Sequence, residues 1–278
     1  LNEKQKADEQ KVTEDCRFAD CQQCGVCDFS ATQNIFAVEN GTKTKHSEPP
    51  AAESLSGIEQ KYRFTFSKTE RAGFLSHLEL SAALLRALRR SSFVLSYTAG
   101  FHPHPKISFA TATSVGMESR QEYMDITAQD YSSNLNLLKI EINSLLPEGI
   151  EILDIRKLAP QEKAIAQALK GFEYALYLPP ITDSPRLQVI EENIKNFLAS
   201  SSFIIPKETK GKTVIKDIRP FVQSLLLDSE NKTVLVTLSF LQEGSARPVD
   251  IITHILKSDA NESRQIRVVK TKTILHQF

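Results

Sequence analysis

Apolar and polar positions alternate where the folded part of the chain begins. The stretch "KYRFTFSK", residues 61–68, keeps this two-residue period and is rich in aromatic residues, which predicts a β-strand. Ser76 and Glu79 follow at the spacing of a capping box, so a helix is predicted to begin there and to run to about Arg90. The apolar residues at three- and four-residue spacing are predicted to form its buried stripe: Leu75, Leu78, Ala82 and Leu85.

The same reading predicts a βαββαβ order for the first half. Strands are predicted at 106–112, 122–128 and 150–158, with an amphipathic helix at 133–146. This order is that of a ferredoxin-like unit.

The second half repeats the order. Its predicted helices cover 185–199 and 247–256, and its predicted strands are 172–178, 202–207, 212–218, 221–227, 232–240 and 265–275. The predicted fold is therefore α+β, with two ferredoxin-like domains in tandem, residues 59–160 and 161–278.

All four cysteines lie in one run near the start of the chain. Cys16, Cys21, Cys24 and Cys27 form C-x4-C-x2-C-x2-C, and four thiols this close together favour a metal or a cluster over disulfides. An iron–sulfur cluster is the first expectation, and zinc in a site of four cysteines is the alternative. Residues 1–30 are thus predicted to be a metal-binding tail, and the polar segment 31–58 a flexible linker.

Net charge and hydropathy exclude several classes of protein. The 278 residues have no net charge, and no apolar run approaches the length of a membrane span. The first 15 residues are almost entirely polar, so no secretory signal is expected there. The chain begins with Leu1, and the expectation is a fragment or the tail of something longer that works in the cytoplasm.

The charge is unevenly distributed along the chain. Between residues 61 and 120, nine lysines and arginines oppose three glutamates, a net charge of +6. A basic first domain in a neutral protein fits binding of anions, nucleic-acid phosphates included, although a solvated basic face is the plain alternative. Arg86 and Arg90 share a face of the predicted helix with Glu79, while Arg89 is predicted to project from the buried side and to reach outward.

The stretch "YTAGFHPHPKISFA", residues 97–110, holds the most distinctive chemistry. His102 and His104 alternate with prolines that favour extended backbone, so they are expected on the same side of the loop as Lys106. Tyr97 and Phe101 could stack on a base. His77, in the first turn of the helix, is expected to be neutral and to complete the group. The histidines could also ligate a metal, or the loop could be a stiff connector with no ligand.

These residues carry a resemblance to a known family. The segment from "FLSHLEL" to "EYMDI" resembles the signature of the radical SAM-linked proteins, a domain family of unknown function. The positions that match the family pattern are Ser76, His77, Glu79, Arg86, Arg89, Arg90, Gly100, Phe101, Pro103, Pro105, Lys106, Gly116, Glu122, Tyr123 and Asp125. Thr98 stands where the pattern has serine, and it keeps the hydroxyl.

The cysteine run carries a second resemblance. "DCRFADCQQCGVCDF" is similar to the extreme C-terminus of the B12-binding radical SAM proteins to which that domain is joined or paired. Together the resemblances cover residues 11–29 and 60–160 and imply the end of a radical SAM protein fused to its linked domain. The C-x3-C-x2-C motif of radical SAM enzymes is absent, so the chain is not expected to cleave S-adenosylmethionine alone.

Two functions fit these patterns. The first is an accessory or substrate-recognition module of a radical SAM enzyme, with RNA as the anionic ligand. The second is an enzyme that acts on a phosphorylated or nucleotide-like substrate with His77 or His104 as general base. A module should present a broad open basic surface. An enzyme should instead show a closed pocket in which His77 and one of His102 or His104 lie within hydrogen-bond reach of each other or of Glu79. The predicted ligand-binding residues are His77, Glu79, Arg86, Arg89, Arg90, Tyr97, Gly100, Phe101, His102, His104 and Lys106.

Overall fold

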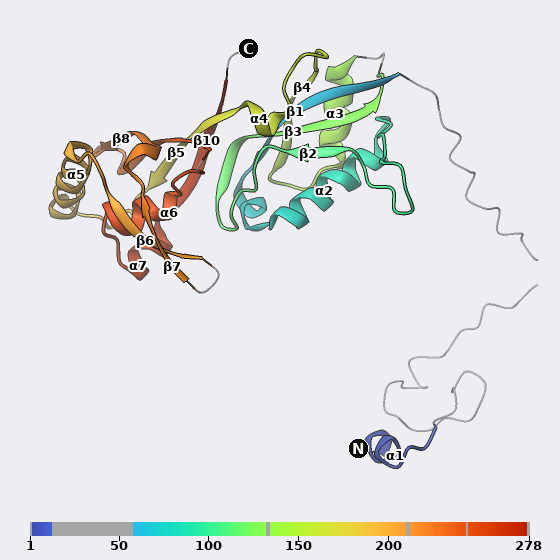
Figure 1. Ribbon diagram of the computed structural model, residues 1–278, viewed down its shortest axis with the longest axis horizontal. Helices are drawn as coiled ribbons and strands as arrows, with labels where there is room; N and C mark the ends of the chain where they lie inside the picture. Colours follow the sequence, from blue (N-terminus) through green and yellow to red (C-terminus); the bar gives the residue numbers. More distant parts are fainter. Residues whose placement is uncertain (1, 13–57, 132–133, 210–211, 243, 277–278) are drawn as a thin grey trace, which may run out of the picture. The chain divides into compact units, whose positions relative to one another are not determined.

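A computed structural model describes residues 2–12, 58–131, 134–209, 212–242 and 244–276 (Figure 1). The chain divides into two compact units, Leu1–Ser56 and Gly57–Phe278. In the first unit the described structure is a short helix, α1 (Asn2–Asp8). The predicted metal site at Cys16, Cys21, Cys24 and Cys27 lies outside the described residues, as does nearly all of the predicted linker.

The first half of the large unit has the predicted order of elements. They are β1 (Glu59–Lys68), the 3-10 turn η1 (Glu70–Phe74), α2 (His77–Arg90), β2 (Ile107–Phe109), β3 (Glu118–Gln129), α3 (Leu135–Leu145) and β4 (Ile150–Lys157). The strands lie in the order β4-β1-β3-β2, and every neighbouring pair is antiparallel. Tyr62, Phe64 and Phe66 of β1 are fully buried and form the centre of the core of this half.

Helix α2 begins as predicted, but the residues that it buries fully are not the predicted ones. Ser76 Oγ accepts a hydrogen bond from the backbone of Glu79, and the Glu79 side chain accepts one from the backbone of Ser76, which completes the capping box. The predicted stripe is right only in part, because Leu78 is 79% exposed, whereas Leu75 and Leu85 are half-buried and pack against the core. The residues that α2 buries also recur at three- and four-residue spacing: Leu80, Ala83, Leu84, Ala87 and Leu88. Both sets have helical periodicity, and packing on the sheet selects the second.

The second half has the same order of paired strands. It contains α4 (Ile165–Ala168), β5 (Leu169–Tyr177), α5 (Ser184–Ala199), β8 (Val222–Asp228), β9 (Thr233–Ser239) and β10 (Arg267–Leu275). Its strands lie in the antiparallel order β10-β5-β9-β8. A hairpin of β6 (Ile204–Thr209) and β7 (Lys212–Asp217) is inserted between α5 and β8 as a separate sheet.

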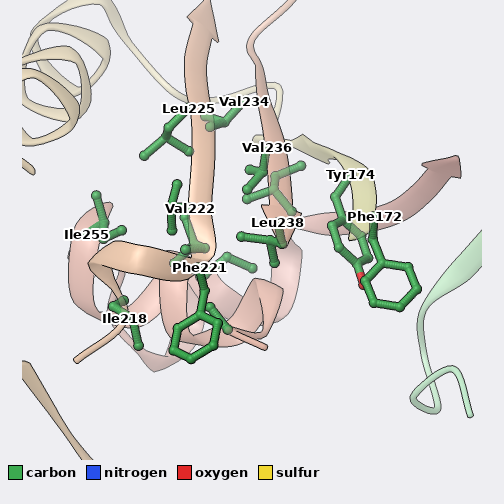
Figure 2. Packing of buried hydrophobic residues seen from close by; sticks show 14 of the residues in the cluster. Phe172, Tyr174, Ile218, Phe221, Val222, Leu225, Val234, Val236, Leu238 and Ile255 are labelled. Carbon is green, nitrogen blue, oxygen red and sulfur yellow. The ribbon is translucent and has the colours of Figure 1, made fainter. Parts of the chain in front are cut away.

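Between β9 and β10 the chain is helical. The predicted helix 247–256 is α6 (Pro248–Asp250), which continues into the π-helical turn η3 (Ile251–Ile255). The short helices α4 and α7 (Ala260–Gln265) were not predicted. Figure 2 shows Val222 and Leu225 of β8 packed beside Val234, Val236 and Leu238 of β9, which forms the core of this half.

Strand β10 joins the two halves into one eight-stranded sheet. It pairs with β5 along its length, and it also pairs in parallel with the start of β3, where Val269 faces Glu118 and Lys270 faces Ser119. The edge of β3 is therefore shared, since β2 covers Met124 to Ile126 and β10 covers Glu118 and Ser119. The structure is a mixed α+β fold in which two cores lie against one sheet. Among the described residues, no helix combines the length and the apolar character that crossing a membrane requires.

Candidate functional site

The histidine loop is a closed excursion from the edge of β3. Tyr97 and Pro105 form an isolated β-bridge at its base, and Thr98 N donates to the His104 carbonyl at 2.8 Å. The Thr98 hydroxyl accepts a hydrogen bond from His104 N at 3.0 Å, which is a use for the hydroxyl that this position shares with serine. Gly100 has a φ of +129°, a value that side-chain-bearing residues rarely adopt. Backbone bonds thus fix the loop.

The side chains at the tip of this loop face solvent. Phe101 is fully exposed, Tyr97 is 41% exposed, and His102 and His104 are exposed too. Lys106 differs, because its Nζ lies 2.8 Å from Glu59 Oε1, and this hydrogen bond is the main reason why the pKa of Glu59 is lowered. The positive charge of Lys106 is therefore matched by Glu59, which lies just outside the basic stretch 61–120.

His77 does not join the loop histidines in a catalytic or metal-binding group. Its ring packs edge-on against Phe109, with the ring centroids 5.0 Å apart. Glu79 is occupied by the capping box, and its hydrogen bond from the backbone of Ser76 lowers its pKa. Within the described ranges, no group of three or more His, Cys, Asp or Glu side chains could hold a metal ion. Ligation of one metal by His77, His102 and His104 is thus not supported.

Three arginines gather at the C-terminal end of α2. Arg86, Arg89 and Arg90 are exposed and line a pocket of about 490 Å³ together with Leu145, Leu146 and Pro147. No ion pair or hydrogen bond to these arginines is present in the described part of the chain. The prediction that Arg89 projects from the buried side is wrong, because Leu78, which marks that side, is itself exposed.

The length of α2 separates the predicted residues into two groups. Fourteen residues at about 1.5 Å each place His77 roughly 20 Å from Arg90 along the helix axis. Beyond Arg90, the C-terminal end of α2, the chain runs on away from His77 and forms the histidine loop there (Figure 1). The arginines and the loop therefore lie toward one end of this half, and His77 lies toward the other.

A second cluster, which the sequence did not reveal, lies where β1, β3 and β10 meet. Lys68, Glu122 and Lys270 are nearly fully buried, with exposed fractions of 0%, 3% and 2%. Lys270 Nζ lies 2.6 Å from Glu122 Oε1, and the Thr113 hydroxyl donates to the same carboxylate oxygen. Lys68 Nζ donates to the Leu75 carbonyl at 2.9 Å. Burial lowers the pKa of Lys68, the Glu122 carboxylate opposes this shift, and the positive charge of Lys270 adds to it.

An irregularity in β3 creates this cluster. Phe66 faces Glu122 and Lys68 faces Ser119, so two steps on β1 correspond to three on β3. The extra residue brings Ser119 and Glu122 to the same buried face, as β-bulges do when they re-aim a side chain. In the sequence, this irregularity coincides with "SRQE", residues 119–122, where four polar residues follow one another and apolar and polar positions no longer alternate. Because the predicted strand begins only at residue 122, this signal falls outside it.

Asp125, another member of the family pattern, has a structural role in the contact between the two halves. Its carboxylate accepts hydrogen bonds from Arg63 Nε at 2.7 Å, from Arg63 Nη2 at 2.9 Å and from Ile165 N at 2.8 Å. Arg63 is 3% exposed and also donates to the carbonyl of Lys163. Through these bonds the pair attaches the connecting segment between the two halves, at Lys163 and Ile165, to the middle of β3.

The fold and these residues define a mixed α+β protein with a basic end on its first half and a buried charge cluster where its halves join. The chain belongs to the family described as "Uncharacterized protein conserved in bacteria (DUF2344)", which matches residues 61–249. The match covers the histidine loop, the arginines of α2 and most of the buried cluster. None of the curated proteins matches the chain.

Two solved structures are similar only at a low level. A chain of a Cbf5-Nop10-Gar1 complex is 12% identical with a TM-score of 0.36, and the alignment covers 76% of this chain and 48% of that one. The chain thus spans about half the length of that relative. An unknown protein from Galdieria sulphuraria is 11% identical with a TM-score of 0.24, over 79% of this chain and 100% of that one. At these values neither likeness bears on fold or function.

Proposed function

We propose that the protein is a substrate-recognition module that binds a single-stranded stretch of RNA for a radical SAM enzyme. The observation that carries the proposal is the group of Arg86, Arg89 and Arg90, three exposed guanidinium groups without a described acidic partner. Phosphates are the counter-charge that such a group recognises, and bidentate contacts to them are typical of arginine.

The loop supplies the second element of an RNA-binding surface. Phe101 and Tyr97 are exposed aromatic side chains on a backbone that is held by its own hydrogen bonds. Proteins that bind single strands combine a basic track with aromatic rings on which bases stack. A rigid loop loses little conformational entropy when a base stacks on it, which favours affinity.

The alternative, an enzyme with a histidine general base, has less support. The exposed His102 and His104 have no neighbouring carboxylate among their described contacts, and His77 packs against Phe109. A general base needs a partner that orients it and a pocket that holds the substrate. An open surface is what a recognition module requires.

The proposal extends to the organisation of the chain. We infer that each half is a ferredoxin-like unit, because both halves have the strand order 4-1-3-2 with antiparallel neighbours. The cysteine run would hold an iron–sulfur cluster, or zinc, at the end of a fused radical SAM protein, as the resemblance implies. In this arrangement the tail belongs to the radical SAM enzyme, and residues 57–278 bind its substrate. The complex would work in the cytoplasm.

The test is a titration of fluorescently labelled single-stranded RNA with the full chain, followed by anisotropy. The double variant Arg89→Ala/Arg90→Ala should bind at least about tenfold more weakly, because it removes two phosphate-binding side chains. The slope of log affinity against log salt should become shallower by about 0.7 for each phosphate that is no longer neutralised. Arg120→Ala, which removes another exposed arginine of the same half, is the matched control and should bind like the unmodified chain. Equal decreases in affinity in both variants, or no binding by the unmodified chain, would overturn the proposal.

A further inference from the structure

A pocket of about 510 Å³ opens beside the buried charge cluster. The turn 111–117 of the first half forms one wall, and Phe172, Tyr174, Phe240 and Lys270 of the second half form another. The volume lies within the range of about 300–1,000 Å³ that small-molecule sites occupy. Sites of this kind commonly form where two structural units meet.

The buried cluster beside this pocket contains more positively charged groups than negatively charged ones. Lys68 and Lys270 are two buried amines, and Glu122 is the one carboxylate among their described partners. Arg247 also lines the pocket and is matched by Asp250, whose carboxylate lies 2.7 Å away. The cluster therefore holds one more amine than carboxylates. An anion bound beside Lys270 would offset this excess of positive charge, which is costly to bury alone, although Lys68 itself does not line the pocket. Lys270 is the buried amine that lines the pocket, and it would meet the anion first.

The rest of the lining suits a flat ring. Phe172 packs beside Tyr174 and Phe240, with 6.1 Å between ring centroids in both pairs. Figure 2 shows the rings of Phe172 and Tyr174 side by side; both are largely buried and belong to the same core as Phe221. Phe240 is 37% exposed, so part of its ring remains free to contact a ligand. Hydroxyl groups of Thr111, Ser114 and Ser263 add hydrogen-bonding capacity to the walls.

We propose that this pocket binds a nucleotide, with its anionic group toward Lys270 and its base against the aromatic wall. The two features required are a cationic group and an aromatic surface in one cavity. Lys270 of β10 supplies the first, and Phe172 and Tyr174 of β5 with Phe240, which follows β9, supply the second. The nucleotide could be free, or it could be one unstacked residue of a bound RNA. In the second case the pocket deepens the proposed function, but the inference stands without the arginines of α2.

The deciding experiment is calorimetric titration of the full chain with adenosine, guanosine, cytidine and uridine 5′-monophosphates. The corresponding nucleosides form the arm without phosphate, and single-stranded tetranucleotides form the arm that represents RNA. Binding of at least one monophosphate is expected, with its nucleoside at least about tenfold weaker because it lacks the charge. Binding of tetranucleotides alone, with the same dependence on the pocket, supports RNA as the source.

The variants locate the site. Phe240→Ala should weaken binding at least about tenfold, since stacking of a base on an aromatic ring has this magnitude. Lys270→Met should abolish the preference for monophosphate over nucleoside, but it also removes the partner of Glu122 and could unfold the chain. Phe240→Ala therefore decides, and Phe74→Ala, at a phenylalanine that is 71% exposed and outside the pocket lining, is its control.

Two results would overturn the proposal. One is that neither monophosphates nor tetranucleotides bind, and the other is that binding is unchanged in Phe240→Ala. Loss of RNA binding in Arg89→Ala/Arg90→Ala with intact binding of monophosphates would leave the pocket in place, so the two proposals can fail separately.

Discussion

The two buried lysines at the junction of the halves differ in the groups that they contact. Lys270 forms the direct ion pair with Glu122, whereas Lys68 donates to a backbone carbonyl and interacts with the carboxylate from farther away. Removing one partner of a buried pair leaves an uncompensated charge, which is more costly than removing an excess charge of the same sign.

Substitution of these lysines should therefore have unequal effects. Lys270→Met should lower the free energy of unfolding by about 3–5 kcal/mol, because Glu122 loses its partner. Lys68→Met should lower it by at most about 1 kcal/mol, since the loss of one hydrogen bond is offset by relief from burying a charge. Urea denaturation monitored by circular dichroism measures both values. Equal decreases would mean that the two amines share Glu122 equally.

A surface carboxylate should control part of the stability in acid. The pKa of Glu162 falls from 4.5 to about 2, first because Arg156 donates to the carboxylate and then because the backbone of Ala159 does. A carboxyl group with a lowered pKa in the folded state stabilises it above the unfolded pKa, and this stabilisation is lost as the pH falls through the folded pKa. The relevant window is about pH 4.5 down to about pH 2.

Glu162→Gln should flatten the pH dependence of the midpoint of thermal unfolding within this window. The variant should be less stable than the unmodified chain at pH 7, and the difference should vanish near pH 2. Thermal melts in steps of half a pH unit test this expectation. A difference that is constant from pH 7 to pH 2 would show that the ionised carboxylate is not the cause.

At the scale of single elements, helix α2 sets the position of the basic residues. Its capping box fixes where the helix begins, and the start then determines that Arg86, Arg89 and Arg90 fall in its last turns. The buried residues from Leu80 to Leu88 then hold the helix on the sheet along its length.

Loss of the cap should destabilise the helix without moving it. Ser76→Ala removes the acceptor for Glu79 N and should cost about 1 kcal/mol, as capping substitutions do. The midpoint of chemical denaturation measures this cost, and Ser81→Ala, within the same helix, is the matched control. An unchanged midpoint in Ser76→Ala would mean that the cap is dispensable for α2.

At the scale of the whole molecule, the tail and the large unit should behave independently. The tail carries the predicted metal ligands, while the core of residues 57–278 is complete within its own sheet. Cys21→Ser or Cys24→Ser should abolish metal content and leave the melting of residues 57–278 nearly unchanged. Metal analysis and calorimetry on the full chain test this, and full metal content in both variants would contradict it.

The colour of the anaerobically purified chain separates the two candidate cofactors. A brown protein indicates an iron–sulfur cluster, and a colourless protein with bound zinc indicates the alternative. Either result is compatible with independence of the tail, because that prediction concerns the melting of residues 57–278 and not the identity of the metal.

Local sequence patterns determined the order of the main elements. Alternation predicted β1, the spacing of Ser76 and Glu79 predicted the start of α2, and the repeat of the order in the second half followed from the same periods. These signals are readable because each depends on residues a few positions apart. The shape of the histidine loop was also readable, since its prolines restrict the backbone and its glycine permits a positive φ.

Only the tertiary structure decided which faces are buried and how the halves join. Two stripes of α2 have the same helical period, and contact with the sheet made Leu80 and Leu84 the buried ones. The bulge in β3 and the parallel pairing of β10 with β3 bring Lys68, Glu122 and Lys270 together from positions more than 200 residues apart at the extremes. Periodicity within a segment contains no information about which edge of a distant strand that segment will meet. The charge cluster and its pocket exist because of that pairing, which long-range packing selects.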